Sequence, residues 1–147
     1  MKILVIGQAP SRKSDPCKPW SHGASAKRLW KWFGVESRDQ LLEVADLFNA
    51  VPYWPGSAGA KGDKIPRGEE LSMVRDRVIR KIRRGGYKHV IVVGKFVDDL
   101  VRDYLRRKNI TALTIPHPSG ANISANGIDE EMIMKLVKFM MIIGEEK

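Results

Sequence analysis

Residues 89 to 94 read His-Val-Ile-Val-Val-Gly, a short continuous apolar run that ends at a glycine. Such a run is typical of a strand that is buried on both faces, as in a parallel sheet. The chain begins with a similar run, Ile-Leu-Val-Ile-Gly at residues 3 to 7, which predicts a second strand of the same kind. Further strands are predicted at residues 46–51 and 111–115 because apolar and β-favouring residues gather there.

Helices are predicted between these strands and after the last one, where apolar residues recur at helical spacing. The predicted helices cover residues 24–33, 69–84 and 97–108, and a last helix is capped by Asp129. The face of this last helix that is expected to pack on the core carries Met132, Leu136, Met140 and Ile143. The alternation predicts an α/β fold with one domain over residues 1–147, a three-layer α/β/α sandwich around a four-stranded parallel sheet.

Composition excludes several classes of protein. Of the 147 residues, 43% are hydrophobic and 29% are charged, which indicates a globular domain and not a disordered segment. Cys17 is the only cysteine, so the chain cannot form an internal disulfide or ligate an iron-sulfur cluster with its own cysteines. The first apolar run is too short for a signal peptide, and no run reaches about 18 apolar residues. We therefore expect a cytoplasmic protein without a membrane partner.

The net charge of +9 is concentrated in one part of the chain. Residues 75–108 contain twelve Lys and Arg against four Asp, and the basic residues of the helix at 69–84 alternate with its apolar face. We interpret this basic face as a solvated helix surface, with a nucleic-acid surface as the alternative. Neutralising Arg80, Arg83 and Arg84 is then expected to leave the salt dependence of DNA binding nearly unchanged. Contacts to DNA are expected instead from cations of the two long loops: Arg12, Lys13, Lys18, Lys61 and Lys64.

Two loops rich in proline and glycine, at residues 8–23 and 52–68, follow the first and second strands. Loops of this length in a small domain are usually functional or disordered. In parallel sheets, ligands bind outside the carboxyl ends of the strands. Polar and aromatic residues at these ends and in these loops are therefore the candidate functional residues: Gln8, Asp15, Trp20, Asn49, Tyr53, Trp54 and His117.

Three short motifs stand at strand ends in a fixed order. Gly7-Gln8-Ala9-Pro10 follows the first strand, Asn49-Ala50-Val51 ends the second, and His117-Pro118-Ser119 follows the fourth. In this order they resemble the motifs of the uracil-DNA glycosylase superfamily. The segment 18–23, Lys-Pro-Trp-Ser-His-Gly, resembles the Pro-Phe-x-Gly segment of several branches, and the run that ends at Gly94 resembles their third strand. The resemblance implies a uracil-DNA glycosylase-like fold over almost the whole chain.

The resemblance also implies a role for each residue of these motifs. His117 would stabilise the leaving base, and Trp20 would stack on a base that has left the duplex. Asn49 would present a donor and an acceptor to the edge of that base. Main-chain amides of Gln8 and Ala9 would contact it as well.

The chain departs from the superfamily pattern at three positions. Ala9 stands where other branches carry an aspartate or asparagine that positions water, and Asp15 is nominated as the substitute. Ser11 stands where a tyrosine blocks the 5-methyl group of thymine, so 5-substituted pyrimidines are not excluded. A wedge leucine is replaced by the sequence that starts at Gly120, which favours single-stranded or unstacked substrates. The residues expected to contact DNA are Ser11, Arg12, Lys13, Ser119, Gly120, Ala121 and Asn122.

We therefore predict a monomeric, monofunctional DNA glycosylase that acts on uracil or a related pyrimidine and needs no cofactor or metal. Ala9 supports an alternative, a catalytically weak or inactive member that binds DNA or a flipped base. A third interpretation is a nucleotide-binding protein of unrelated chemistry. It is disfavoured because the loop after the first strand is not a glycine-rich phosphate loop.

Overall fold

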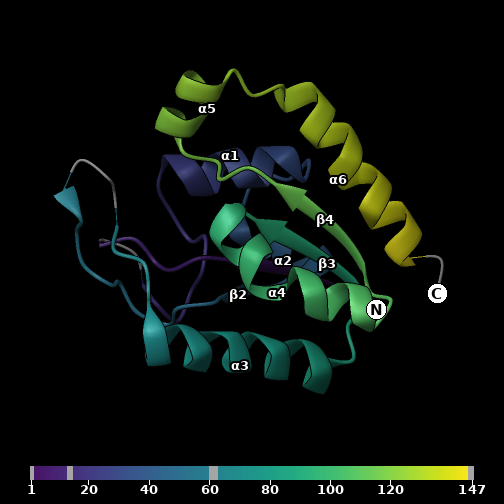
Figure 1. The fold of residues 1–147 in the computed structure, drawn as a ribbon. Coiled ribbons are helices and arrows are strands. Elements are labelled where there is room, and N and C mark those ends of the chain that lie inside the picture. Colours follow the sequence, from purple (N-terminus) through teal and green to yellow (C-terminus); the bar gives the residue numbers. More distant parts are fainter. Residues whose placement is uncertain (1, 13–14, 60–62, 146–147) are drawn as a thin grey trace.

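The computed structural model describes residues 2–12, 15–59 and 63–145. Four parallel strands form one sheet in the order β2-β1-β3-β4 (Figure 1). The strands are β1 (Ile3–Gly7), β2 (Ala45–Asn49), β3 (His89–Val93) and β4 (Thr111–Ile115). The helices are α1 (Ala24–Trp32), α2 (Arg38–Val44), α3 (Gly68–Gly85), α4 (Lys95–Arg107), α5 (Gly120–Asn126) and α6 (Glu130–Glu145).

Helices cover both faces of the sheet, which confirms the predicted three-layer α/β/α arrangement. α3 and α4 lie on one face, and α1 and α6 lie on the other (Figure 1). Successive residues of β1 point to opposite faces, so that Leu4 packs with the α3 and α4 side and Val5 with the α1 and α6 side. Both side chains are fully buried, as a strand covered on both faces requires.

Three of the predicted helices are present, and their ends differ from the prediction by one or two residues. They are α1, α3 and α4, which were predicted at residues 24–33, 69–84 and 97–108. The second strand begins one residue earlier than predicted, because α2 runs directly into β2 at Ala45, and it ends two residues earlier, at Asn49. Ala50 and Val51, which we assigned to this strand, still lie beside the end of β1. Their amides donate to the carbonyl oxygens of Gly7 and Gln8 at 2.8 and 2.7 Å.

No helix was predicted between the fourth strand and Gly127, where we expected a loop, but most of this segment forms α5. The Ser119 hydroxyl caps this helix by accepting from the Asn122 amide at 3.1 Å. Gly127 ends it with a φ of 57°, a left-handed conformation that favours glycine. A helix of seven residues is too short for its apolar spacing to be distinguished from a loop.

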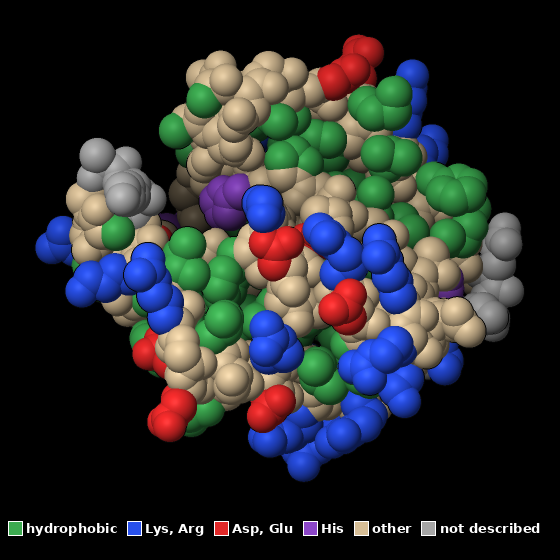
Figure 2. Space-filling model, in the orientation of Figure 1, with side chains coloured by type: hydrophobic (Ala, Val, Ile, Leu, Met, Phe, Trp, Pro, Cys, Tyr) green, Lys and Arg blue, Asp and Glu red, His purple; other side chains and the backbone are tan. Residues whose placement is uncertain are grey.

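The face predicted for the last helix was wrong at two positions. Met132 and Leu136 are 52% and 41% exposed, whereas Ile133 and Val137 are buried. α6 is turned so that Gly144 lies against β1, where a Cβ on this glycine would stand 3.3 Å from Cγ1 of Ile3. Side chains on the other side of α6 stay exposed, and Figure 2 shows hydrophobic side chains over this part of the molecule. Asp129 caps α6 as predicted, by accepting from the Met132 amide at 3.2 Å.

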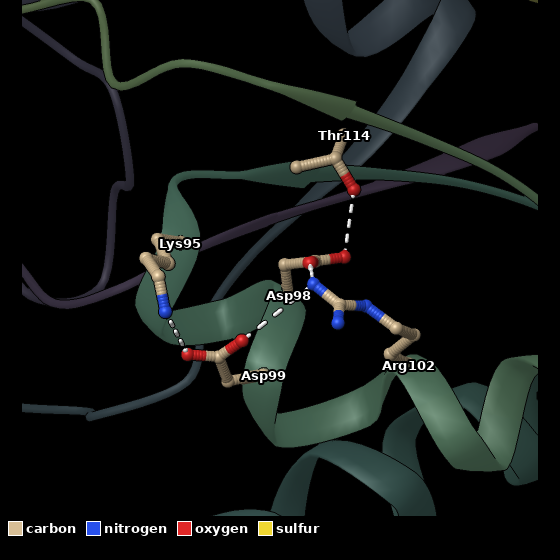
Figure 3. Close-up of polar contacts among 5 residues, drawn as sticks. All are labelled: Lys95, Asp98, Asp99, Arg102 and Thr114. Carbon is tan, nitrogen blue, oxygen red and sulfur yellow. Dashed lines mark hydrogen bonds and ion pairs between the residues drawn. The ribbon is translucent and has the colours of Figure 1, made fainter.

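A polar network joins α4 to the edge strand β4 (Figure 3). The hydroxyl of Thr114 donates to Asp98 at 2.8 Å, and Arg102 forms an ion pair with the same carboxylate. Burial favours a higher pKa for Asp98, but the hydrogen bonds from Arg102 and Thr114 outweigh it and lower the pKa. Lys95 pairs with Asp99 at 2.9 Å one turn away. The network therefore fixes the outer edge of the sheet against α4.

Among the described residues, no helix has the length and apolar character that a membrane crossing requires.

Candidate active site

A pocket of about 280 Å³ opens at the carboxyl ends of β1 and β2. The two long loops lie together on this side of the sheet (Figure 1). The pocket volume lies just below the usual range for small-molecule sites, which begins at about 300 Å³, so the pocket suits a single small ring. The residues that line it are Ala9, Pro10, Ser11, Pro19, Trp20, His22, Gly23, Ala24, Ser25, Ala26, Asn49, Asp63 and His117.

Gly7 lies at the centre of this arrangement, at the end of β1 and in register with Asn49 of β2. A Cβ on Gly7 would stand 2.9 Å from Oδ1 of Asn49 and 2.9 Å from Cζ2 of Trp20. The two side chains therefore meet over the main chain of Gly7, and only glycine leaves room for both. The structure thus brings together two of the residues that the sequence predicted to bind a base.

Trp20 adopts a backbone conformation that is unusual for a tryptophan, with a φ of 59°. Two hydrogen bonds hold the main chain there: Nε1 of Trp30 donates to the carbonyl of Trp20 at 3.0 Å, and Nε of Arg38 donates to that of Pro19 at 2.8 Å. The indole Nε1 of Trp20 is buried and has no hydrogen-bond partner among the described residues. Strained backbone and an unpaired buried donor are both features of functional sites.

His117 lies beside Trp20, with ring centroids 5.8 Å apart and planes tilted by 44°. Its own carbonyl accepts from Nδ2 of Asn122 at 2.9 Å, and Arg28 donates to the next carbonyl, that of Pro118, at 2.7 Å. These bonds fix the loop on both sides of the imidazole. Burial lowers the pKa of His117, although the nearby charge of Asp63 acts in the opposite direction. The imidazole is therefore neutral at pH 7.

The two carboxylates of the long loops have different positions. Both are exposed. Asp15 is not among the residues that line the pocket, and it accepts from the Cys17 amide at 2.9 Å as in an Asx turn. Asp63 lines the pocket beside His117 and accepts from Nε1 of Trp54 at 3.1 Å. Asp63 was not predicted as a site residue, because it does not lie at the end of a predicted strand. Its place depends on how the loop folds, through Trp54 and a bridge to Ser57.

Sequence reasoning also missed His22, which lines the pocket and contacts the Ser21 hydroxyl through Nδ1 at 3.1 Å. Gln8 and Ala9 line a small hollow next to the pocket that also includes Asp63 and His117. Gln8 and Ala9 therefore lie beside the candidate site, and contact between their main-chain amides and a base stays a prediction.

The residues predicted to contact DNA fall into three groups. Ser11 lines the pocket, and the guanidinium of Arg12 lies 6.0 Å from the ring centroid of Trp54. Ser119 and Asn122 bond within the loop and α5, whereas Gly120 and Ala121 are exposed. Lys18 and Lys64 are exposed, and Lys13 and Lys61 lie outside the described residues.

Arg77 of α3 connects the site to the opposite layer of the protein. Its Nη1 donates to the carbonyl oxygen of Asn49 at 2.6 Å and to that of Ala50 at 3.1 Å. Its guanidinium also lies over the ring of Phe48, 4.2 Å from the centroid. The end of β2, which carries the Asn49 side chain into the pocket, is thereby held from the α3 side.

Within residues 2–12, 15–59 and 63–145, no group of three or more His, Cys, Asp and Glu side chains is arranged to hold a metal ion. The arrangement offers instead a neutral imidazole, an amide, an indole and one carboxylate around a small hollow. This set can hold a planar heterocycle and stabilise negative charge that develops on it.

A family model described as the uracil DNA glycosylase superfamily matches residues 1–140 of the chain. A search of curated proteins finds no match.

Proposed function

The chain belongs to the uracil-DNA glycosylase superfamily, and on that basis we propose that it is a monofunctional DNA glycosylase. It hydrolyses the N-glycosidic bond of uracil or of a related deaminated or modified pyrimidine in DNA. The observation that carries this proposal is the meeting of Asn49 and Trp20 over Gly7, with His117 beside them in the same pocket.

Each of these side chains has a place in the proposed reaction. When the bond between C1′ and the base nitrogen breaks, both electrons leave on the base, so negative charge develops on its carbonyl oxygen. The neutral imidazole of His117 donates a hydrogen bond to that oxygen. Asn49 reads the pairing edge of the base, and Trp20 packs against it once the nucleotide has left the stack.

Asp63 is the carboxylate that we assign to the sugar side of the reaction. The cation that forms at C1′ is favoured by a nearby negative charge, and the water that adds there must lose a proton. Asp63 stands at the pocket and Asp15 does not. Ala9 cannot perform this role, because its side chain has no polar atom.

The test is base release from single strands and duplexes that contain uracil or other modified pyrimidines, detected as alkali-labile abasic sites. We expect His117→Ala and Asn49→Ala to lower the rate by about 10²-fold or more, the usual effect of losing such a donor. Asp63→Asn is expected to lower it as well, with Asp15→Asn as the matched control that keeps near-normal activity. If the wild-type protein, in excess over DNA, released none of these bases, the proposed activity would be refuted.

Ala9 supports a second candidate function, a protein that binds a flipped base without excising it. This form of the proposal predicts binding that depends on the modified base but yields no product. Excision by Ala9→Asp or Ala9→Asn would then identify a water-positioning group as the missing part, since either change adds a polar side chain at the pocket wall.

A further inference from the structure

Four basic side chains lie along one face of the second half of α3, beside the edge strand β2. The second, third and fourth of them follow the first by three, four and seven residues, so all four share one side of the helix. They line a groove of about 430 Å³ that also includes Phe48 and Gly85. We call this groove the α3 basic groove, and its four cations are Arg77, Arg80, Lys81 and Arg84.

Nothing within the described part of the chain neutralises these charges. The ion pairs among the described residues involve other cations, and none joins a residue of the α3 basic groove to a carboxylate. Like charges at this spacing oppose each other and destabilise a helix. Lys and Arg side chains also gather toward the end of α3 in Figure 2. A surface that concentrates repelling charges in this way is suited to an anionic ligand with several charges.

The α3 basic groove begins at the candidate active site. Its first member, Arg77, donates to the carbonyl of Asn49, whose side chain lines the pocket. Phe48 is the residue before Asn49, and its ring lies under the guanidinium of Arg77. The centroid of this ring is 5.6 Å from Nζ of Lys81. From this point the cations follow α3 over about 10 Å, at 1.5 Å per residue, toward the amino end of β2. A chain molecule that leaves the pocket past β2 meets them in sequence.

We propose that the α3 basic groove binds the phosphates of a single DNA strand that leads away from the pocket. This inference rests on the proposed function for the choice of DNA as the ligand. The groove turns from the strand ends down the side of the sheet, and a flexible single strand can follow that turn. A duplex is stiff over about 150 base pairs and passes over the strand ends without bending into the groove.

A strand bound along α3 differs from the expectation from the sequence, in which the loops contact DNA and the basic face of this helix is only solvated. That expectation assumed that a helix on the face of the sheet does not reach the site at the strand ends. The hydrogen bonds from Arg77 to Asn49 and Ala50 provide such a connection.

The experiment compares the binding of a uracil-free single strand of about 20 nucleotides by four proteins over 50 to 300 mM salt. These are the wild type, the groove variant Arg80→Gln/Arg84→Gln, its charge-conserving counterpart Arg80→Lys/Arg84→Lys, and the control Arg106→Gln/Arg107→Gln, which removes two exposed cations at the far end of α4. Arg77 and Lys81 are kept because they contact Phe48. We expect the groove variant to lower the salt slope by about 1.4, which weakens binding about 25-fold at 0.1 M salt. The control and the charge-conserving Arg80→Lys/Arg84→Lys should keep the wild-type slope.

A groove variant with the wild-type slope would overturn the proposal, as would an equal loss in the control, which would reveal a mere effect of net charge. Loss of duplex binding as large as that of single-strand binding would overturn the single-strand assignment. Tighter binding of an RNA of the same sequence would overturn DNA as the ligand. The strand contains no uracil, so its binding is measured independently of base release. A wild type that binds it through the groove but releases no base from the modified strands of the activity test would refute the proposed function and leave the groove proposal standing.

Discussion

Arg77 and Asn49 are joined across two layers of the protein: Nη1 of the arginine, on α3, donates to the main-chain carbonyl of the asparagine at 2.6 Å. The same nitrogen donates to Ala50 at 3.1 Å, so one guanidinium holds two successive carbonyls at the end of β2. The side chain of Asn49 points from this strand end into the pocket. Its position therefore depends on a residue that is itself outside the pocket.

Arg77→Met is expected to lower kcat/KM for base release by about ten- to a hundredfold, because hydrogen bonds from a charged group contribute roughly 1.5–3 kcal/mol. Steady-state kinetics on a uracil-containing strand measures this change. Tyr87→Phe is the control, since it removes the hydrogen bond to Asp46 at the other end of β2 and should lower stability alone. Equal activity losses in the two variants would show that Arg77 acts only through the stability of the fold.

Gly7→Ala is expected to reduce base release at least a hundredfold while the protein stays folded. The added Cβ would stand 2.9 Å from both Asn49 and Trp20, so at least one of these side chains must move out of place. Circular dichroism and base release together measure the effect. Gly59→Ala is the control for backbone strain away from the pocket, because this exposed loop position has open space around its Cβ but a φ of 72°, which disfavours alanine. Unchanged activity in Gly7→Ala would contradict the role of this contact.

The activity of the wild type is expected to stay constant as the pH falls through 6.5, the ordinary pKa of histidine, and to decline only below it. Burial lowers the pKa of His117, so the neutral donor persists in the folded protein to a lower pH. A profile of kcat/KM against pH measures this. The unfolded chain takes up its proton near 6.5, so stability attributed to His117 should fall as the pH drops below that value. A kcat/KM that rises as the pH falls through 6.5 would show instead that the imidazolium form is the active one.

Asp98→Asn is expected to lower the free energy of unfolding at pH 7 by about 1 kcal/mol, the usual value of such a partly exposed hydrogen-bonded pair. The lowered pKa of Asp98 gives the sign of the pH dependence. The contribution is complete above about pH 4, the pKa in the unfolded chain, and disappears as the pH falls through the lower pKa of the folded state. Urea unfolding at several pH values measures it, with Asp76→Asn on α3 as the control. A difference that stays constant down to pH 2 would contradict this assignment.

Several features of this protein follow from its sequence alone. Apolar runs such as Ile3 to Ile6 are fully buried by helices on both faces, so their composition alone indicates a parallel sheet. Asn49 ends β2 and His117 lies two residues after β4, and parallel strands bring their carboxyl ends to one edge. The three-layer fold and the neighbourhood of these two residues were therefore predictable.

Other features depend on contacts between segments that are distant in the sequence. Asp63 reaches the pocket because Trp54 and Ser57 fold its loop back, and no local pattern encodes that path. Arg77 appears in the sequence as one more charge on a basic helix, yet it is partly buried against Asn49. The exposed side of α6 was misassigned because Gly144 fits against Ile3, which is a matter of packing and not of spacing. The sequence by itself determined which elements form and where the strand ends meet, because these follow from local periodicity and burial. The tertiary structure decided which carboxylate and which arginine join the site, because these depend on long-range packing.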